Sequence, residues 1–279
     1  MIQKSYDGKN ALYLIPTPIG NMEDITMRAL NILELVDYVL CEDTRVTKVL
    51  LEYFNLKKKL VSCHEHNEDT VKKKVLEDLK DGKNIGLVTD QGSPIISDPG
   101  YRVVEYVTQN NQNVIALPGA TAFVPALMTS GIDSSKFIFY RFTNAKHSKR
   151  VKELEILKPM QYTIVFYEAV HRIKEFIDDL YNAFGNRKVV IARELSKLHE
   201  EIYRGSLEEL KNCDITLKGE FVIVVEGNKE NIDYSDISII EHVKMYIEEG
   251  NSEKDAIKLV AKDRKVAKSD IYKEYHINK

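Results

Sequence analysis

A loop of glycine, proline and acidic residues follows a short apolar segment in GLVTDQGSPIISDPG (residues 86–100). Residues 85–89 are enough for a buried strand and too few for a helix. Asp90 begins the loop, Gly92 permits close backbone approach, and Pro94 prevents a continuing central strand. Open α/β sheets bind ligands in such loops, at the carboxyl ends of strands. The carboxylate and N–H groups could hold a small zwitterionic molecule, although an ordinary strand–loop–helix connection fits the same residues.

Charged residues also follow an earlier predicted strand. The apolar segment 37–41 ends in Glu42-Asp43-Thr44-Arg45, with two adjacent acids and an arginine. These side chains form either a surface charge pair or part of the lining of a cleft. Taken alone, the segment favours the surface interpretation.

Two histidines follow the strand predicted at residues 60–63. His64, His66 and Glu68 invite a metal assignment, because imidazole and carboxylate groups are common metal ligands. Alternating positions on one extended segment give only a partial ligand set, and the sequence has no second histidine cluster to complete it. Substrate contact or helix capping is therefore favoured, and no metal is expected.

The second half of the chain repeats this pattern of charges at strand ends. Strands are predicted at residues 137–142, 161–167, 188–192 and 221–226. Glu168 and Arg172 follow the second of these strands, and Arg193 and Glu194 follow the third. A basic segment, 144–152, follows the first. Such a run is usually a solvated face, but beside a cleft it would suit phosphate contacts.

Short strands alternate with amphipathic helices in the first half of the chain. Strands are predicted at residues 11–15, 37–41, 60–63, 85–89 and 113–117, and helices at 24–35, 69–81 and 101–110. This alternation predicts a mostly parallel sheet with helices on both faces. The turn after the first strand, PTPIGN, has no Lys-Ser/Thr after its glycine and no GxGxxG, so neither a nucleotide P-loop nor a nicotinamide site is supported.

Composition describes a soluble globular chain of about two domains. The 279 residues are 43% hydrophobic and 30% charged, and the formal charge is −3. This charge gives no overall attraction to nucleic acid, so any basic face must be local. No apolar run approaches a membrane span, and the start has no signal-peptide core. Cys41, Cys63 and Cys213 form no CxxC pair, so we expect buried thiols in the cytoplasm.

The C-terminal segment differs from the rest in charge. After a polar linker predicted at 228–237, the pattern predicts a helix at 239–249 stopped by Gly250, a second capped by Ser252, and a third beginning near Ser269. Residues 254–273 carry seven basic residues against three acidic ones, a difference of +4. Short helices with one basic face resemble a helix-turn-helix module, and a dimerisation cap is the alternative.

An ordered set of motifs now supports a family resemblance. The motifs are PTPIGN, EDTR, HEHNE, VTDQGSPIISDPGY, LPGATA, YEAVHR, ARELSK and KGEFVIVVEG, spread over residues 11–227. Together they resemble the ribosomal RNA small subunit methyltransferase I family, within the tetrapyrrole methylase superfamily. Two motifs depart from the family pattern: DQGSP replaces DAGTP, and YRFTN (140–144) stands where a GFLP-like sequence is usual.

The resemblance implies two α/β domains with mostly parallel sheets, at residues 1–120 and 121–230, and a helical extension at 236–279. It also implies a cytoplasmic homodimer that uses S-adenosylmethionine to methylate a ribose 2′-hydroxyl, usually of a cytidine in the decoding region of small-subunit ribosomal RNA. By motif match, the cofactor pocket would include Pro18, Asp90, Gly92, Ser93, Pro94, Ser97, Thr121, Ala122, Tyr167, Gly219, Glu220 and Phe221. Contacts with substrate RNA would come from Arg45, His64, His66, Lys146, Arg150 and Arg172.

Methyl transfer from a sulfonium is an in-line displacement, so positioning should supply much of the catalysis. A ribose hydroxyl is a poor nucleophile until its proton begins to leave, and a base should therefore help. Glu168 and Asp43 are the candidates, although Glu168 and Arg172 also fit a simple i,i+4 pair. Two other functions fit the same chain: a tetrapyrrole (precorrin-type) methyltransferase, and a non-catalytic nucleic-acid-binding regulator.

Overall fold

The computed structural model describes residues 2–4, 8–229, 237–248 and 250–277. By compactness the chain divides into two units, Met1–Asn228 and Lys229–Lys279. Most of the predicted linker at 228–237 falls outside the described residues, as does the predicted start of the extension at residue 236. The domain boundary at residue 120 stays a prediction.

The first sheet has five strands in the order β3-β2-β4-β1-β5, and every pairing in it is parallel. Its strands are β1 (Ala11–Leu14), β2 (Tyr38–Cys41), β3 (Lys59–Ser62), β4 (Ile85–Leu87) and β5 (Asn113–Ala116). Successive residues of β2, such as Val39 and Leu40, are both fully buried, as expected for a strand covered on both faces. The register pairs Leu14 with Leu87, so the loops after β1 and β4 leave the sheet side by side.

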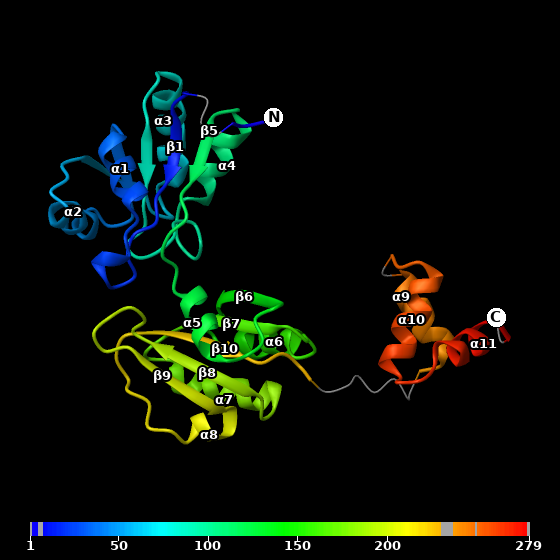
Figure 1. Cartoon of the computed structure of the whole chain (residues 1–279). Helices are drawn as coiled ribbons and strands as arrows, with labels where there is room; N and C mark the ends of the chain where they lie inside the picture. The colour runs from blue at the N-terminus through cyan, green and yellow to red at the C-terminus, as the bar shows by residue number, and fades with distance from the viewer. Residues whose placement is uncertain (1, 5–7, 230–236, 249, 278–279) are drawn as a thin grey trace. The chain divides into compact units, whose positions relative to one another are not determined.

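Helices cover both faces of this sheet (Figure 1). They are α1 (Met27–Leu35), α2 (Thr44–Tyr53), α3 (Glu68–Lys80) and α4 (Tyr101–Gln109). Apolar residues of α1 and α2, such as Leu33 and Leu51, pack on one face, and those of α3 and α4, such as Leu79 and Val103, pack on the other. Thr26 caps α1 by accepting a hydrogen bond from the N–H of Ala29.

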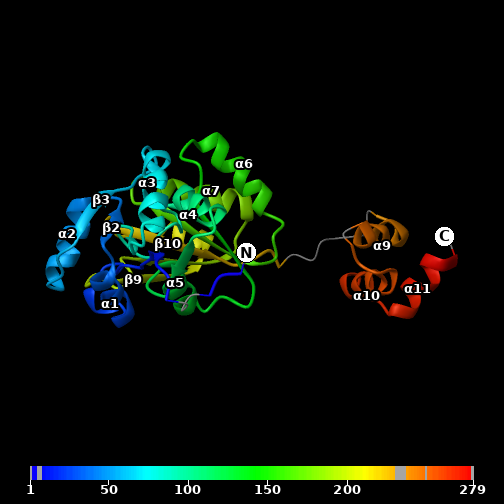
Figure 2. The same ribbon diagram turned by 90° about the horizontal axis from the view of Figure 1, so that it is seen from above.

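The second sheet is mixed, with the order β6-β7-β10-β8-β9. Its strands are β6 (Phe137–Phe142), β7 (Thr163–Ala169), β8 (Lys188–Arg193), β9 (Glu201–Ser206) and β10 (Glu220–Val225). Only β6 and β7 pair in parallel; the other three pairings are antiparallel. One face packs on α5 (Phe123–Ser130), and the other on α6 (His147–Leu157), α7 (Ile173–Phe184) and α8 (Leu207–Lys211), with α6 and α7 adjacent (Figure 2).

The C-terminal unit contains α9 (Ile239–Glu248), α10 (Glu253–Asp263) and α11 (Lys268–Ile277) around one apolar cluster. Gly250 has a φ of +94°, and the Ser252 hydroxyl accepts a hydrogen bond from the N–H of Asp255 at the start of α10. The predicted glycine stop and serine cap are therefore both confirmed.

The predicted fold class is confirmed: two sheets with helices, mostly parallel when both sheets are counted, and a helical extension. The parallel arrangement is concentrated in the first sheet. Strand β9 and helices α2, α5, α6, α7 and α8 are not among the elements predicted from the sequence. Cys41 and Cys63 are buried as expected, but Cys213 is exposed. Within the described ranges, no helix is both long and apolar enough to cross a membrane.

Candidate active site

Hydrogen bonds join four loops at the carboxyl ends of the first sheet's strands. Thr17, after β1, exchanges two backbone hydrogen bonds with Gly92, after β4, at N···O distances of 2.9 and 3.1 Å. Ser93 donates to the carbonyl of Ala120, after β5, at 3.0 Å, and the N–H of Asp43, after β2, donates to Asp90 at 3.1 Å. The loops therefore form one connected surface at the ligand-binding edge of the sheet.

Gly92 fits this surface for two physical reasons. Its φ is +83°, a backbone conformation that residues other than glycine rarely adopt. A Cβ atom added there would lie 3.3 Å from Ile19 and 3.6 Å from the carbonyl oxygen of Ala120. The Gly92 N–H is already bonded to Thr17, so this group is not free to bind a ligand, contrary to the general expectation for the loop.

These loops line a cavity of about 550 Å³ together with residues of the second sheet; we call it the central cavity. Ten of the predicted cofactor residues line it: Asp90, Gly92, Ser93, Ser97, Thr121, Ala122, Tyr167, Gly219, Glu220 and Phe221. Pro18 instead lines a neighbouring cavity of about 310 Å³, which shares Asp90 and Gln91 with the central one. Pro94 is buried and lines neither.

Aromatic residues form one wall of the central cavity. The rings of Phe142 and Tyr167 lie edge to face at a centroid distance of 5.6 Å, and both residues line the space. The Tyr167 hydroxyl interacts with the Thr121 side chain and with the backbone at the start of α5. Burial raises the pKa of Tyr167 above its usual value, so the ring remains neutral at physiological pH.

Glu168 places a carboxylate in the same cavity. The residue is only 2% exposed, and Arg172 donates a hydrogen bond from Nε to its Oε1 at 2.8 Å, with Nη2 forming an ion pair with the same oxygen at 2.6 Å. The Oε2 atom is buried and accepts no hydrogen bond from the described residues. A buried carboxylate oxygen without a donor is costly unless a ligand supplies one.

Asp43, the other predicted base, has a different environment. Its carboxylate binds the exposed guanidinium of Arg45 at 2.6 Å, and this pairing lowers the pKa of Asp43 to about 2. Asp43 lines neither the central cavity nor the neighbouring one. A carboxyl with so low a pKa accepts a proton poorly at neutral pH, so the geometry disfavours the predicted role.

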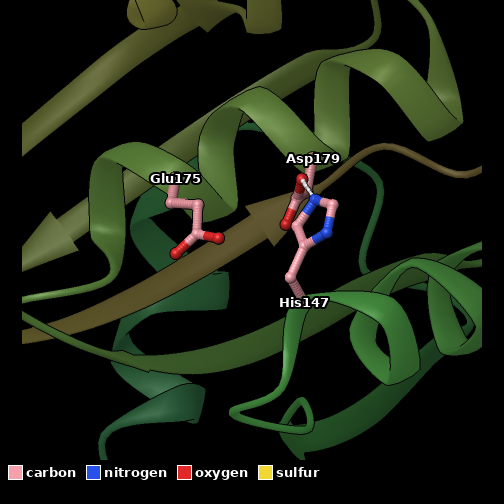
Figure 3. Close-up of side chains that lie close together, drawn as sticks. All are labelled: His147, Glu175 and Asp179. Atoms are coloured by element: carbon pink, nitrogen blue, oxygen red, sulfur yellow. Dashed lines mark hydrogen bonds and ion pairs between the residues drawn. The ribbon is translucent and has the colours of Figure 1, made fainter.

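Arg150, predicted to contact RNA, is fully buried. Its guanidinium lies 2.6 Å from both Asp179 and Glu175, and His147 lies 3.1 Å from Asp179. Figure 3 shows the three side chains around the guanidinium, with His147 facing Asp179 and Glu175 one turn away on α7. His147, Glu175 and Asp179 are close enough to hold a metal ion, but Arg150 already neutralises the carboxylates. This ion cluster explains Arg150 as part of the core, which corrects the predicted RNA contact.

The remaining predicted RNA contacts lie in several environments. Lys146 is exposed at the start of α6, and Arg45 is exposed on α2. The His64 and His66 rings lie 5.9 Å apart, and Glu68 is buried with its carboxylate bonded to the N–H of Gly100. Glu68 therefore stabilises the loop before α4.

A further cavity of about 640 Å³ lies beside the central one. Its lining includes His66, Tyr101, Arg102 and Arg141, and we call it the arginine cavity. Asp98 lines both this space and the central cavity. Asp98 is not among the site residues predicted from the sequence, although it lies within the motif VTDQGSPIISDPGY.

Comparisons with known proteins identify the family. A family model for Tetrapyrrole (Corrin/Porphyrin) Methylases matches residues 11–211. The chain is 46% identical to ribosomal RNA small subunit methyltransferase I of Halalkalibacterium halodurans, over 98% of each chain. It is 45% identical to the Bacillus subtilis protein of the same name, over 99% of this chain and 98% of that one. The chain belongs to the tetrapyrrole methylase family.

The predicted resemblance to the ribosomal RNA small subunit methyltransferase I family is thereby confirmed, and so is the predicted class of enzyme, a methyltransferase. Among solved structures, uroporphyrin-III-C-methyltransferase from Thermus thermophilus matches 78% of this chain and 94% of its own, with a TM-score of 0.57 and 18% identity. At this identity the likeness concerns the fold alone.

Proposed function

We propose that this methyltransferase uses S-adenosylmethionine to methylate the ribose 2′-hydroxyl of a cytidine in the decoding region of small-subunit ribosomal RNA. The observation that carries the proposal is the full-length similarity to two proteins named ribosomal RNA small subunit methyltransferase I. The motif resemblance supports the finer details, the 2′-oxygen and the cytidine. A cytoplasmic homodimer is part of the same proposal.

The central cavity fits the proposed cofactor in size and chemistry. Its volume of about 550 Å³ lies in the range of small-molecule sites. Asp90 and Glu168 supply carboxylates that suit the ammonium and sulfonium charges of the molecule. The unpaired Oε2 of Glu168 gives a buried acceptor for one of its donors. When bound, the cofactor supplies a methyl group activated by the positive sulfur.

The protein's own residues would then position the reactants and exclude water. The linked loops around Gly92 and Ser93 fix one side of the cavity, and Phe142 and Tyr167 form an apolar wall on the other. Such a preformed site lowers the entropic cost of alignment for an in-line transfer.

The C-terminal helices support an RNA substrate. Residues 254–273, which span most of α10, the connection and the first half of α11, carry seven basic side chains against three acidic ones, in a chain with a net charge of −3. A local basic surface attracts the phosphate backbone without contributing sequence selectivity. We propose that this unit increases RNA affinity and that the central cavity carries out the chemistry.

A labelled methyl-transfer assay tests the proposal. Full-length protein should transfer the methyl group of S-adenosylmethionine to purified small ribosomal subunits or to their RNA, and nuclease digestion should give a 2′-O-methylated cytidine. A label found on a base instead of a ribose would contradict the proposed acceptor atom. Transfer to a precorrin-type macrocycle with no transfer to RNA would favour the tetrapyrrole methyltransferase instead.

A further inference from the structure

The position of Asp98 distinguishes it from the other carboxylates of the site. Asp98 lines both the central cavity and the arginine cavity, whereas Glu168 lines the central cavity alone. A group that removes a proton from the acceptor during transfer must contact both the acceptor and the reacting centre. If the methyl donor fills the central cavity and the methyl acceptor enters through the arginine cavity, only a residue at the junction of the two cavities meets that requirement.

Thr89 fixes the Asp98 carboxylate in place. Its hydroxyl, two residues after β4, donates to Asp98 Oδ1 at 2.8 Å, and Thr89 is itself 2% exposed. Burial raises the pKa of Asp98 above the usual value of 3.8. The hydrogen bond from Thr89 and the charge of Arg141 lower this pKa, and the nearby charge of Asp90 raises it further. A held carboxylate with a raised pKa is better suited to accept a proton than an ordinary surface aspartate.

The arginine cavity has the chemistry of a sugar–phosphate site. Arg102 and Arg141 supply two guanidinium groups, which bind phosphates through several N–H donors. Tyr101 and His66 supply exposed rings on which an unpaired base could stack. Arg102 binds Asp69 at 2.6 Å and Arg141 binds Ser97 at 2.9 Å, so each arginine is held at the cavity by a polar contact with a neighbouring side chain.

Unusual backbone conformations surround this junction. Ile95, Ser97 and Arg141 have φ values of +75°, +81° and +75°, although none of them is glycine. Arg141 also lies at a shift in the register between β6 and β7, the kind of bulge that redirects a side chain. Left-handed conformations cost free energy, more so for a β-branched residue such as Ile95, and they cluster at functional sites.

We propose that the arginine cavity binds the sugar–phosphate of the target nucleotide and that Asp98 accepts the proton of the hydroxyl that is methylated. The ribose oxygen takes the methyl carbon as the carbon–sulfur bond breaks, sulfur keeps that bond's electron pair, and the hydroxyl proton passes to Asp98 and then to water. This inference rests on the proposed function, because it presumes an RNA acceptor.

The substitution Asp98→Asn in the full-length protein tests the proton acceptor. Asparagine keeps the shape and the acceptor for Thr89, so calorimetry with S-adenosylmethionine and the affinity for a small-subunit RNA transcript should both remain at the level of the unmodified protein. Single-turnover methylation should fall by roughly 10²–10⁴-fold, the usual contribution of general base catalysis. The rate of the unmodified protein should fall at acid pH as Asp98 becomes protonated, and this fall should be absent in the variant. Unchanged single-turnover rates would overturn the assignment of Asp98.

The substitutions Arg102→Ala and Arg141→Ala test the sugar–phosphate site by equilibrium binding alone. Each should weaken binding of the RNA transcript and reduce the slope of log affinity against log salt by about 1. Lys80→Ala, which removes an exposed charge at the far end of α3, is the matched control and should leave the slope unchanged. If both arginine variants behave like the control, the site assignment is wrong. Failure of the unmodified protein to methylate RNA would instead refute the proposed function itself.

Discussion

Two groups of arginine and acidic residues in this protein show opposite arrangements. In the ion cluster, the Arg150 guanidinium is fully buried and lies 2.6 Å from each of two carboxylates. At the arginine cavity, Arg141 and Asp98 line the cavity wall. Among the described residues, the Asp98 carboxylate accepts a hydrogen bond from Thr89. Charges satisfied within the fold serve the architecture, whereas charges held at a cavity wall remain available to a ligand.

The difference follows from the cost of removing charge from water. A buried charge is tolerated when partners compensate for its lost hydration, which the ion cluster provides internally. A site for an ionic ligand must leave some of its charged groups without a full set of protein partners, so that the ligand supplies the missing contacts. The comparison therefore predicts large stability effects and small binding effects at Arg150, and the reverse around the cavities.

The largest effect on stability is expected for Arg150→Met. This change removes the cation that pairs with the buried Asp179 and the partly exposed Glu175. Removing one partner of a buried ion pair typically costs about 3–5 kcal/mol of stability. Denaturant unfolding of the full chain measures this loss. Arg45→Ala, which removes an exposed pair with Asp43, is the control and should leave the free energy of unfolding nearly unchanged. Equal losses in the two variants would remove the basis for the comparison.

A smaller effect, on binding, is expected for Glu168→Gln. The change removes the negative charge beside the unpaired Oε2 position, so we expect the dissociation constant of S-adenosylmethionine to rise roughly tenfold, or about 1.4 kcal/mol. Calorimetry gives this value directly. Glu155→Gln, at an exposed position paired with Lys158 on α6, is the matched control and should bind the cofactor normally. A normal dissociation constant for Glu168→Gln would argue that Oε2 does not contact the cofactor.

The smallest effect is the change in stability expected for Asp98→Asn. A carboxyl whose pKa is raised by folding binds its proton more tightly in the native state, so its contribution to stability falls as pH rises from the unfolded value of 3.8 through the native value. Asparagine removes this penalty, and the melting temperature near pH 7 should stay equal or rise slightly. The difference between variant and unmodified protein should vanish below pH 3.8. A clear decrease in melting temperature at pH 7 would show that the carboxylate stabilises the fold.

Much of the first sheet was predictable because each strand is a short apolar segment followed by turn residues. The strands predicted at 85–89 and 113–117 are found at Ile85–Leu87 and Asn113–Ala116, within two residues of their predicted ends. The strand Glu201–Ser206 was missed because its sequence, EIYRGS, contains charged residues and a glycine and lies on an edge of the sheet. Edge strands need fewer apolar residues, so their pattern is weak.

The spacing of apolar residues around Arg150 could have shown that this side chain is buried and does not contact RNA. Arg150, Leu154 and Leu157 are spaced as one face of a helix, and all three are buried in α6. The surrounding run of lysines conceals this face when only net charge is considered. Asp98 could not be singled out in this way, because its importance depends on the meeting of β4, the loop before α4 and the bulge in β6.

The order of strands in the first sheet has a consequence for how the protein is made. β1 pairs with β4 and β5, which follow it by about 70 and 100 residues, although β1 is the first of them to be synthesised. At translation rates of about 5–20 residues per second, this strand leaves the ribosome several seconds before either partner exists. The nascent chain thus carries an exposed apolar segment during that interval, and we expect co-translational chaperones to bind there before the sheet closes.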